Sequence, residues 1–162
     1  MIEYAIHPPF HGKDIKSRQV VEIGESYFWR IRAVPREMVP VSFWEWIERE
    51  GLQDFNSILV NVYQNKKDNI GWHRDKTSNL ASGEVVSYSF AINEEDQGRV
   101  LANMEFKCEE DPTLVISHEL KHGTRVEFDA LDDEKTKTNH RVAKTKFPRL
   151  NITLRKVVPL PN

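Results

Sequence analysis

The sequence predicts a mainly β protein of the α+β class, and three observations support this prediction. Segments rich in β-branched and aromatic residues fill most of the chain after residue 56. Polar, glycine or proline positions separate these segments at short intervals, as in a sandwich or barrel. One segment has a clear helical pattern. Because 162 residues are enough for one hydrophobic core, we expect a single domain over residues 1–162.

The helix is expected within residues 39–52, VPVSFWEWIEREGL. Ser42 can cap its N-terminus and Glu45 can complete a capping box, whereas Gly51 is a natural end. An apolar face results from three residues at helical spacing, Phe43, Trp46 and Ile47. A helix with one apolar face packs against a larger element, so we expect it to flank a sheet.

Strands are expected on both sides of this helix. Residues 18–34, RQVVEIGESYFWRIRAV, have the composition of a strand and a turn. The strands after the helix are expected at residues 57–63, 84–92, 99–106, 113–118, 124–131 and 149–158. Their number and short connections predict an antiparallel sandwich.

Composition and charge exclude several function classes. A formal net charge of −2 argues against a surface coated in positive charge, although lysines and arginines cluster in residues 12–18, 29–36 and 135–149. The single cysteine, Cys108, excludes an internal disulfide framework and fits a reducing compartment. The N-terminus, MIEYAIHPPFHGK, has no secretory signal, and no apolar run is long enough to span a membrane. We expect a monomeric cytoplasmic protein, or a nuclear one in a eukaryote, without a membrane partner.

Residues 118–122, HELKH, match the His-Glu-x-x-His pattern of zinc peptidases. That zinc site needs a helix, because only one helical face brings both imidazoles to one metal ion. Here the motif lies between two strand-like segments and is followed directly by Gly123. We therefore expect a turn, and a zinc peptidase built on His118 and His122 is the least favoured alternative.

A stronger signal lies in NVYQNKKDNIGWHRDK, residues 61–76. His73 and Asp75 are two residues apart, so on a strand they would share a face and could share a metal ion. His140, in TNHRVAK, offers a third ligand. Two histidines and one carboxylate form the facial triad of non-haem Fe(II) oxygenases, which leaves positions open for a co-substrate and O₂.

The C-terminal segment PRLNITLRKV predicts a strand with two different faces. The polar positions are Arg149, Asn151, Thr153 and Arg155, and the alternate positions are Leu150, Ile152 and Leu154. Two inward arginines cost free energy unless they meet anions. A dicarboxylate would satisfy both through bidentate hydrogen bonds, and the chain's own Asp or Glu residues are the alternative partners. Asn61 and Tyr63, spaced in the same way, could bind the same dicarboxylate.

Taken in order, these motifs resemble the AlkB family of Fe(II)/2-oxoglutarate dioxygenases, closest to the members that repair alkylated DNA in animals. The motifs are Asn61-x-Tyr63, DNIGWHRD, His140 and Arg149-x-Asn151-x-Thr153-x-Arg155. The similarity extends from about Arg18 to Val157. It implies a double-stranded β-helix, or jelly roll, with one flanking helix. It also implies a short nucleotide-recognition lid over residues 1–40 and a catalytic core over residues 41–162.

The resemblance further implies the cofactors and the residues that hold them. Fe(II) would be bound by His73, Asp75 and His140, with O₂ as the oxidant. Tyr63, Arg149 and Asn151 would hold the distal carboxylate of 2-oxoglutarate, with Arg155 and Asn61 near its iron-bound end. No catalytic residue beyond the metal ligands is implied. The family has a structural His-Gly pair where this chain has His122 and Gly123.

The implied reaction is oxidative demethylation of N-alkylated bases in DNA or RNA, of the 1-methyladenine or 3-methylcytosine type. 2-Oxoglutarate and O₂ would yield succinate and CO₂, while the hydroxylated methyl group leaves as formaldehyde. A base in a duplex must be extruded to reach such a site. The expected substrate contacts are Trp29, Tyr27, Arg18, Lys76, Arg74 and Phe10, with further phosphate contacts from Arg30, Arg32 and residues 135–146.

One departure from the family motif supports an alternative substrate. Lys76 and Thr77 follow the His-x-Asp motif, where DNA-repair members carry acidic residues. A lysine there would repel a cationic methylated base unless its side chain turned to a phosphate or to solvent. The alternative is therefore an AlkB-like hydroxylase of another modified base, a nucleotide or a small molecule.

Overall fold

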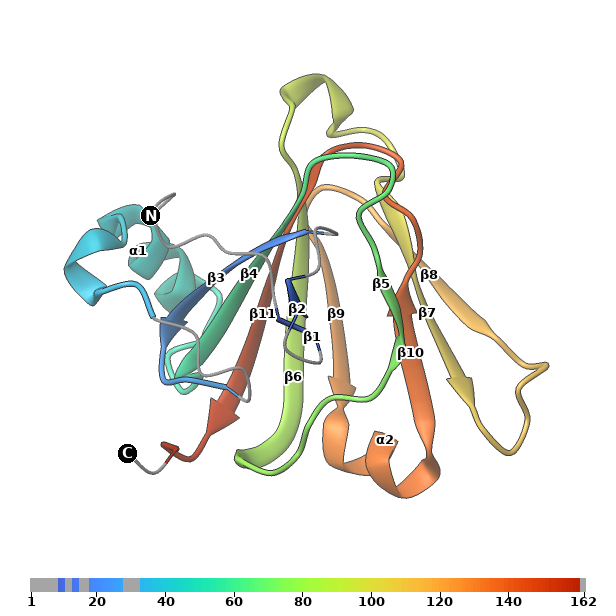
Figure 1. Ribbon diagram of the computed structural model, residues 1–162. Coiled ribbons are helices and arrows are strands. Elements are labelled where there is room, and N and C mark those ends of the chain that lie inside the picture. Colours follow the sequence, from blue (N-terminus) through green and yellow to red (C-terminus); the bar gives the residue numbers. More distant parts are fainter. Residues whose placement is uncertain (1–8, 11–12, 15–17, 28–32, 161–162) are drawn as a thin grey trace.

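The computed structural model describes residues 9–10, 13–14, 18–27 and 33–160. Two antiparallel sheets face each other across the interior of the protein (Figure 1). One sheet has five strands, in the order β3 (Gln19–Gly24), β4 (Ser57–Tyr63), β11 (Arg149–Val157), β6 (Leu80–Ala91) and β9 (Thr124–Asp129). The other has four, in the order β5 (Ile70–His73), β10 (Thr138–Val142), β7 (Ala102–Cys108) and β8 (Ile116–Leu120).

The remaining elements are short. Among the described residues, the helices are α1 (Val41–Arg49) and α2 (Ala130–Thr136), and the 3₁₀ turns are η2 (Arg36–Met38) and η3 (Glu94–Asp96). A separate two-stranded hairpin consists of β1 (Pro9–Phe10) and β2 (Lys13–Asp14). No helix in the described ranges is long and apolar enough to cross a membrane.

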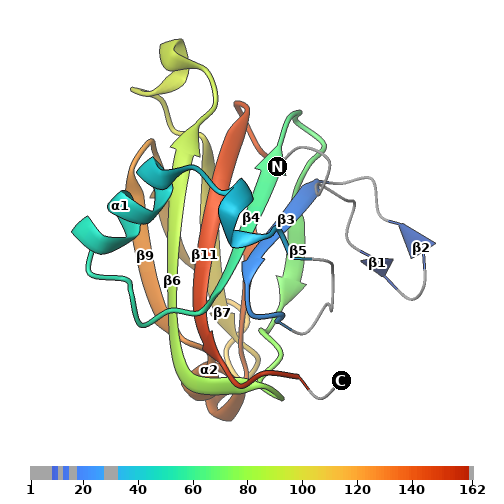
Figure 2. The same ribbon diagram turned by 90° about the vertical axis from the view of Figure 1, so that its left-hand side faces the viewer.

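Helix α1 lies across the outer face of the five-stranded sheet (Figure 2). Its buried residue Ile47 and its half-buried aromatic residues pack on aliphatic side chains from several strands of that sheet. Those buried partners include Val21, Ile58, Val86 and Leu154. Burial of this apolar surface is the main source of the stability of the fold.

The expected start of α1 is wrong, and its expected end is confirmed. Pro40 occupies the N-cap position and no side chain caps the helix, so Ser42 lies within the first turn. A proline fixes its own φ near the helical value, and here Phe43 N donates to the Pro40 carbonyl (3.0 Å) to begin the helix without a capping box. Gly51 adopts a left-handed φ of 69° and ends the helix.

Each expected strand overlaps an observed one, but strands β5 and β10 and helix α2 were not expected. Residues 57–63 form β4 as expected, but the strand expected at residues 124–131 ends at Asp129. Asp129 instead caps α2, since its Oδ1 accepts from Leu131 N and Asp132 N (both 2.9 Å). The cap and the acidic first turn are helix-start signals that outweigh the strand-like composition before them.

The HELKH segment is not a helix, which removes the geometry that a zinc peptidase needs. It is only partly the expected turn, because residues 118–120 complete β8 and the turn lies at residues 121–123. Gly123 has a φ of 80°, in the left-handed region, and its N–H donates to the Ser89 carbonyl. His122 Nδ1 accepts from Ala91 N (3.2 Å), so His122 is a structural residue, as expected.

The range expected to form a lid contains a strand of the main sheet. β3 pairs with β4 along its whole length and forms one edge of the five-stranded sheet. Phe10 lies in β1, whereas Trp29, Arg30 and Arg32 lie outside the described residues. The division into a lid and a core remains a prediction.

Candidate metal and co-substrate site

Three of the predicted site residues meet between the two sheets. His140 on β10 pairs directly with His73 at the end of β5, and their ring centroids are 4.4 Å apart. Asp75 Oδ1 lies 3.6 Å from His140 Nε2 and 4.0 Å from His73 Nε2. Within the described ranges, this is the only group of three or more His, Cys, Asp or Glu residues with ligand atoms this close. The group is the set of oxygen and nitrogen donors that suits Fe(II).

Both imidazoles have the protonation state that metal binding needs. Burial, together with the neighbouring His73, lowers the pKa of His140 to about 4, and burial also lowers the pKa of His73. Both rings are therefore neutral at pH 7. His73 Nδ1 lies 2.7 Å from the Gly71 carbonyl, which can only accept, so Nδ1 carries the proton and Nε2 keeps its lone pair. His140 packs against Phe106 and Phe128, which shield it from water.

Asp75 is positioned by a side chain rather than by a strand. It lies two residues beyond the end of β5, not on the strand as expected from the His-x-Asp spacing. Arg155 donates to its Oδ2 from both Nε (2.8 Å) and Nη2 (2.6 Å), which leaves Oδ1 facing the histidines. Burial alone would raise the pKa of Asp75, but Arg155 and the two histidines outweigh burial and lower it. Asp75 is therefore a carboxylate with one oxygen available to a metal ion.

Arg149 and Tyr63 form a second feature beside the triad, since Tyr63 lines the same cavity and Arg149 packs on the Tyr63 ring. Both are fully buried, and the Arg149 guanidinium carbon lies 4.0 Å from the centre of the Tyr63 ring. Arg149 Nη1 donates to Ser89 Oγ (3.4 Å), but Arg149 Nε, Arg149 Nη2 and Tyr63 Oη have no hydrogen-bond partner among the described residues. Burial lowers the pKa of Arg149, and the nearby Tyr63 partly offsets this. Buried donors without partners are costly, and a carboxylate would satisfy all of them.

The two predicted arginines thus have different roles. Arg155 pairs with the chain's own Asp75, which is the alternative left open by the sequence, whereas Arg149 fits the external carboxylate. The predicted asparagines are also engaged internally. Asn151 Nδ2 donates to Ser87 Oγ (2.8 Å) and to the Tyr88 carbonyl, and Asn61 Nδ2 donates to Asn151 Oδ1 (3.5 Å). They line the cavity and hold its wall in place.

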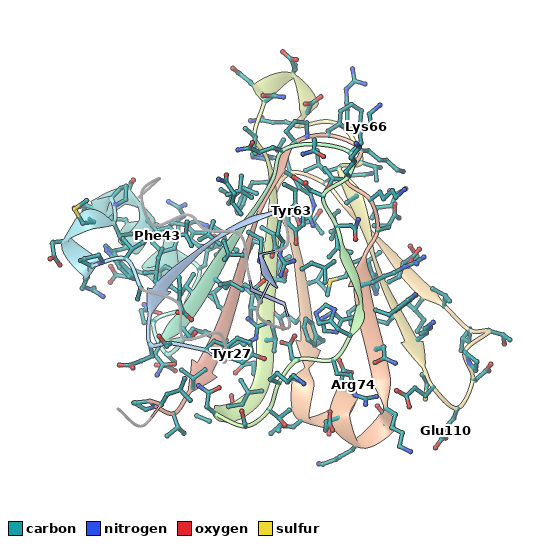
Figure 3. All side chains as sticks on the ribbon, in the orientation of Figure 1. Tyr27, Phe43, Tyr63, Lys66, Arg74 and Glu110 are labelled. Atoms are coloured by element: carbon teal, nitrogen blue, oxygen red, sulfur yellow. The ribbon has the colours of Figure 1, made fainter. Side chains whose placement is uncertain are left out.

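A cavity of about 1020 Å³ lies between the two sheets at this site. Its walls include the metal triad, Tyr63, Arg155 and the expected substrate contacts Arg18, Tyr27, Arg74 and Lys76. Arg18 Nε donates to Asn61 Oδ1 (2.9 Å). Arg74 forms ion pairs with Glu109 and Glu134, and Figure 3 shows it near the lower end of the four-stranded sheet. Tyr63 and Tyr27 lie toward opposite ends of the five-stranded sheet in the same view.

Two residues of the site were missed at the level of sequence. Ser89 is buried on β6 and accepts from Arg149, and Glu22 is fully buried on β3. The alternation of polar and apolar residues that predicted the polar face of β11 is also present in residues 84–91. There Ser87 and Ser89 occupy the inward positions. In residues 18–24, the same spacing relates Glu22 to Arg18.

The fold and the triad together define an oxygenase of the non-haem iron class, and the comparisons with known proteins agree. Residues 30–155 match the 2OG-Fe(II) oxygenase superfamily, and the chain belongs to this family. The family works with Fe(II), 2-oxoglutarate and O₂, so the expected cofactors are confirmed.

The sequence is similar to the alpha-ketoglutarate-dependent dioxygenase alkB homolog 3 of Bos taurus (30% identical) and of Mus musculus (31% identical), in each case over 119 residues. This confirms the resemblance to the AlkB family. Each alignment covers 71% of this chain and 41% of the relative, so the chain spans about two fifths of the length of these proteins.

The fold is also that of a solved structure. A prolyl-4-hydroxylase of Pseudomonas putida superposes with a TM-score of 0.57 at 13% sequence identity. The match covers 96% of this chain and 78% of the hydroxylase. At this identity the likeness concerns the fold alone, and it confirms the expected jelly roll.

Proposed function

We propose that the protein is an Fe(II)- and 2-oxoglutarate-dependent dioxygenase that demethylates N-alkylated bases in DNA or RNA. One observation carries the proposal: a His-Asp-His triad lines the same cavity as Tyr63, and Tyr63 and the adjacent Arg149 hold buried polar atoms that have no partner among the described residues. The first group fits a metal ion and the second fits the carboxylate of a co-substrate. The similarity to alkB homolog 3 supports a nucleic-acid substrate.

In this proposal His73, Asp75 and His140 hold the iron. Bound Fe(II) would supply the redox chemistry that couples O₂ and 2-oxoglutarate to hydroxylation of a C–H bond. Arg149 and Tyr63 bind the distal carboxylate and thereby orient the co-substrate. A cavity of about 1020 Å³ is large enough for the co-substrate together with one extruded base.

Four exposed lysines support a polyanionic substrate. Lys66 and Lys67 lie on the loop after β4, and Lys144 and Lys146 lie on the loop before β11. Thr145 N donates to the Asp68 carbonyl (3.3 Å), so the two loops are adjacent. Figure 3 shows Lys66 at the upper end of the molecule. Lysines gathered in this way contact phosphates without regard to base sequence.

Turnover with defined oligonucleotides tests the proposal. The protein would be incubated with Fe(II), 2-oxoglutarate and oligonucleotides that contain 1-methyladenine or 3-methylcytosine, with formaldehyde, succinate and base mass followed together. We expect equal amounts of formaldehyde and repaired base. His73→Ala should abolish both, whereas His118→Ala, on exposed β8, should not. Dependence on His118 instead of His73 would support a metallopeptidase site.

One observation favours a second candidate, a hydroxylase of another modified base, a nucleotide or a small molecule. Lys76 lines the cavity directly after the metal ligand Asp75, where a cationic base would be repelled. Succinate formation without oligonucleotide demethylation would favour this candidate. Absence of Fe(II)-dependent 2-oxoglutarate binding would contradict both.

A further inference from the structure

The three metal-site residues are held in place by different means. His73 and His140 face each other on paired strands, so the sheet fixes their backbones. Asp75 lies in the segment between β5 and β6, beyond the last ladder pair of β5. Its position must therefore come from side chains that contact it or the residues beside it.

Tyr27 contacts both groups that could fix Asp75. Its ring centre lies 4.3 Å from the guanidinium carbon of Arg155, the residue that binds Asp75 Oδ2. Its hydroxyl donates to the carbonyl oxygen of Lys76, the residue directly after Asp75 (2.7 Å). The ring thus backs the arginine, while the hydroxyl holds the backbone of the ligand segment.

Tyr27 is itself fixed by buried contacts. Only 4% of its surface is exposed, and its backbone N–H donates to Oε1 of the fully buried Glu22 (2.7 Å). Ser26 Oγ donates to the other oxygen of Glu22 (3.2 Å). Asn79 Nδ2, from the far end of the segment that carries Asp75, donates to the Ser26 carbonyl (3.1 Å). The turn after β3 is therefore joined to both ends of the segment that follows β5.

We propose that Tyr27 is a positioning residue for the metal ligand Asp75, acting through the Arg155 guanidinium and the Lys76 carbonyl. This inference rests on the proposed metal site. It gives Tyr27 a role different from the substrate contact expected from the sequence, because both its ring face and its hydroxyl are committed to groups that hold Asp75. Loss of a partner that orients a metal ligand typically lowers metal affinity by about 10- to 100-fold.

Tyr88 provides a matched control on the opposite face of the same sheet. It is also 4% exposed, and its hydroxyl also makes a short hydrogen bond, to Glu50 Oε2 (2.8 Å). Tyr27→Phe and Tyr88→Phe therefore each remove one hydroxyl and leave the ring, and Tyr88→Phe also removes the hydrogen bond that Arg125 Nη1 donates to the hydroxyl (3.0 Å). They differ in that only Tyr27 contacts the Asp75 segment.

The test is a titration of the metal-free protein with Co(II), followed by the visible absorption of the bound ion. We expect Tyr27→Phe to weaken Co(II) affinity about 10-fold and to change the spectrum, and Tyr27→Leu to have a larger effect. Tyr88→Phe should bind Co(II) as the wild type does. Thermal unfolding of each variant without metal reports the stability change separately, so Tyr27→Phe remains informative if Tyr27→Leu does not fold.

Three results would overturn the inference, and they are distinguishable. If wild-type protein binds Co(II) and Tyr27→Phe has the same affinity and spectrum, Tyr27 does not position Asp75, while the metal site stands. If the wild-type protein does not bind Co(II), the proposed site fails as well. An equal loss of affinity in Tyr88→Phe would also contradict the inference, because the effect would then be a general loss of packing.

Discussion

The two faces of the five-stranded sheet are made by the same strands and have opposite properties. On β11, Ile152 and Leu154 point outward and are buried among the side chains that pack on α1. The alternate residues Thr153 and Arg155 point inward and bind other polar groups. A period of two along each strand is enough to separate the two faces.

The difference shows where stability and function reside in this molecule. The outer face buries apolar surface, and none of the described residues of its cluster carries a buried polar side-chain atom without a partner. The inner face buries charges and contains partnerless atoms on Tyr63 and Arg149. Such atoms lower stability. We therefore expect substitutions on the inner face to change ligand binding and those on the outer face to change folding.

The largest expected effect is at Asp75, the proposed metal ligand that pairs with Arg155 of the inner face. Asp75→Asn removes the ligand charge and leaves Arg155 buried without its carboxylate. We expect Fe(II) affinity to fall by more than about 100-fold, beyond the usual effect of an outer-shell change, and turnover to be undetectable. Co(II) titration and succinate formation measure this. Asp68→Asn is the control, since Asp68 is similarly buried but accepts from Gln64 N. Equal losses in both variants would contradict the assignment.

On the inner face, Arg149→Met should weaken 2-oxoglutarate binding without lowering the stability of the fold. Arg149 has one long hydrogen bond, to Ser89, and two buried nitrogens without a partner among the described residues, so its removal should leave the free energy of unfolding unchanged or raise it by about 1–3 kcal/mol. The KM for 2-oxoglutarate should rise by roughly 100-fold, because a buried charge pair is lost, with Fe(II) affinity retained. Urea denaturation and succinate kinetics test both parts. Arg99→Met, at an exposed arginine, should change neither; a normal KM in Arg149→Met would refute the carboxylate role.

Leu154→Ala tests the outer face. Leu154 is fully buried in the cluster under α1, and a cavity there should lower the free energy of unfolding by about 2–5 kcal/mol. The Co(II) affinity of the folded protein should stay within about 2-fold of wild type, since the residue faces away from the cavity. Urea denaturation gives the first quantity, and Co(II) titration below the unfolding transition gives the second. The exposed Val158→Ala should alter neither. A metal-binding defect in Leu154→Ala would show that the faces are not independent.

The same contrast explains how much could be predicted from the sequence. The polar and apolar alternation of residues 149–155 predicted both faces of β11, because side-chain direction in a strand is a local property. His140 was offered as a third ligand on residue type alone, and its assignment to the iron site beside His73 came from the resemblance to a known family, since no local rule relates residues so far apart. The partner of Arg155 was left open at the level of sequence. Charge and spacing alone cannot distinguish an internal carboxylate from an external one.

The smallest expected effect concerns Asp133 on α2, the residue directly before the cavity-lining Glu134. Burial, together with Asp75 and other nearby carboxylates, raises the pKa of Asp133 to about 6, and its Oδ2 has no partner among the described residues. A carboxyl with a raised pKa binds its proton more tightly in the folded state, so folding is opposed once the pH rises from about 4 through 6. Asp133→Asn should therefore stabilise the protein at pH 7, by about 1 kcal/mol after allowance for solvent screening.

The gain from Asp133→Asn should disappear below about pH 4, where the carboxyl is protonated in both the folded and the unfolded states. Urea denaturation at several pH values measures it. Asp132→Asn, one residue earlier and exposed beside Lys135, should change stability by less than about 0.5 kcal/mol at every pH. A gain that did not depend on pH would mean that α2 propensity, rather than the charge near the metal ligand, limits stability here. Together with Leu154→Ala, this pair would show that removing a polar group beside the cavity stabilises the fold, whereas removing an apolar group on the outer face weakens it.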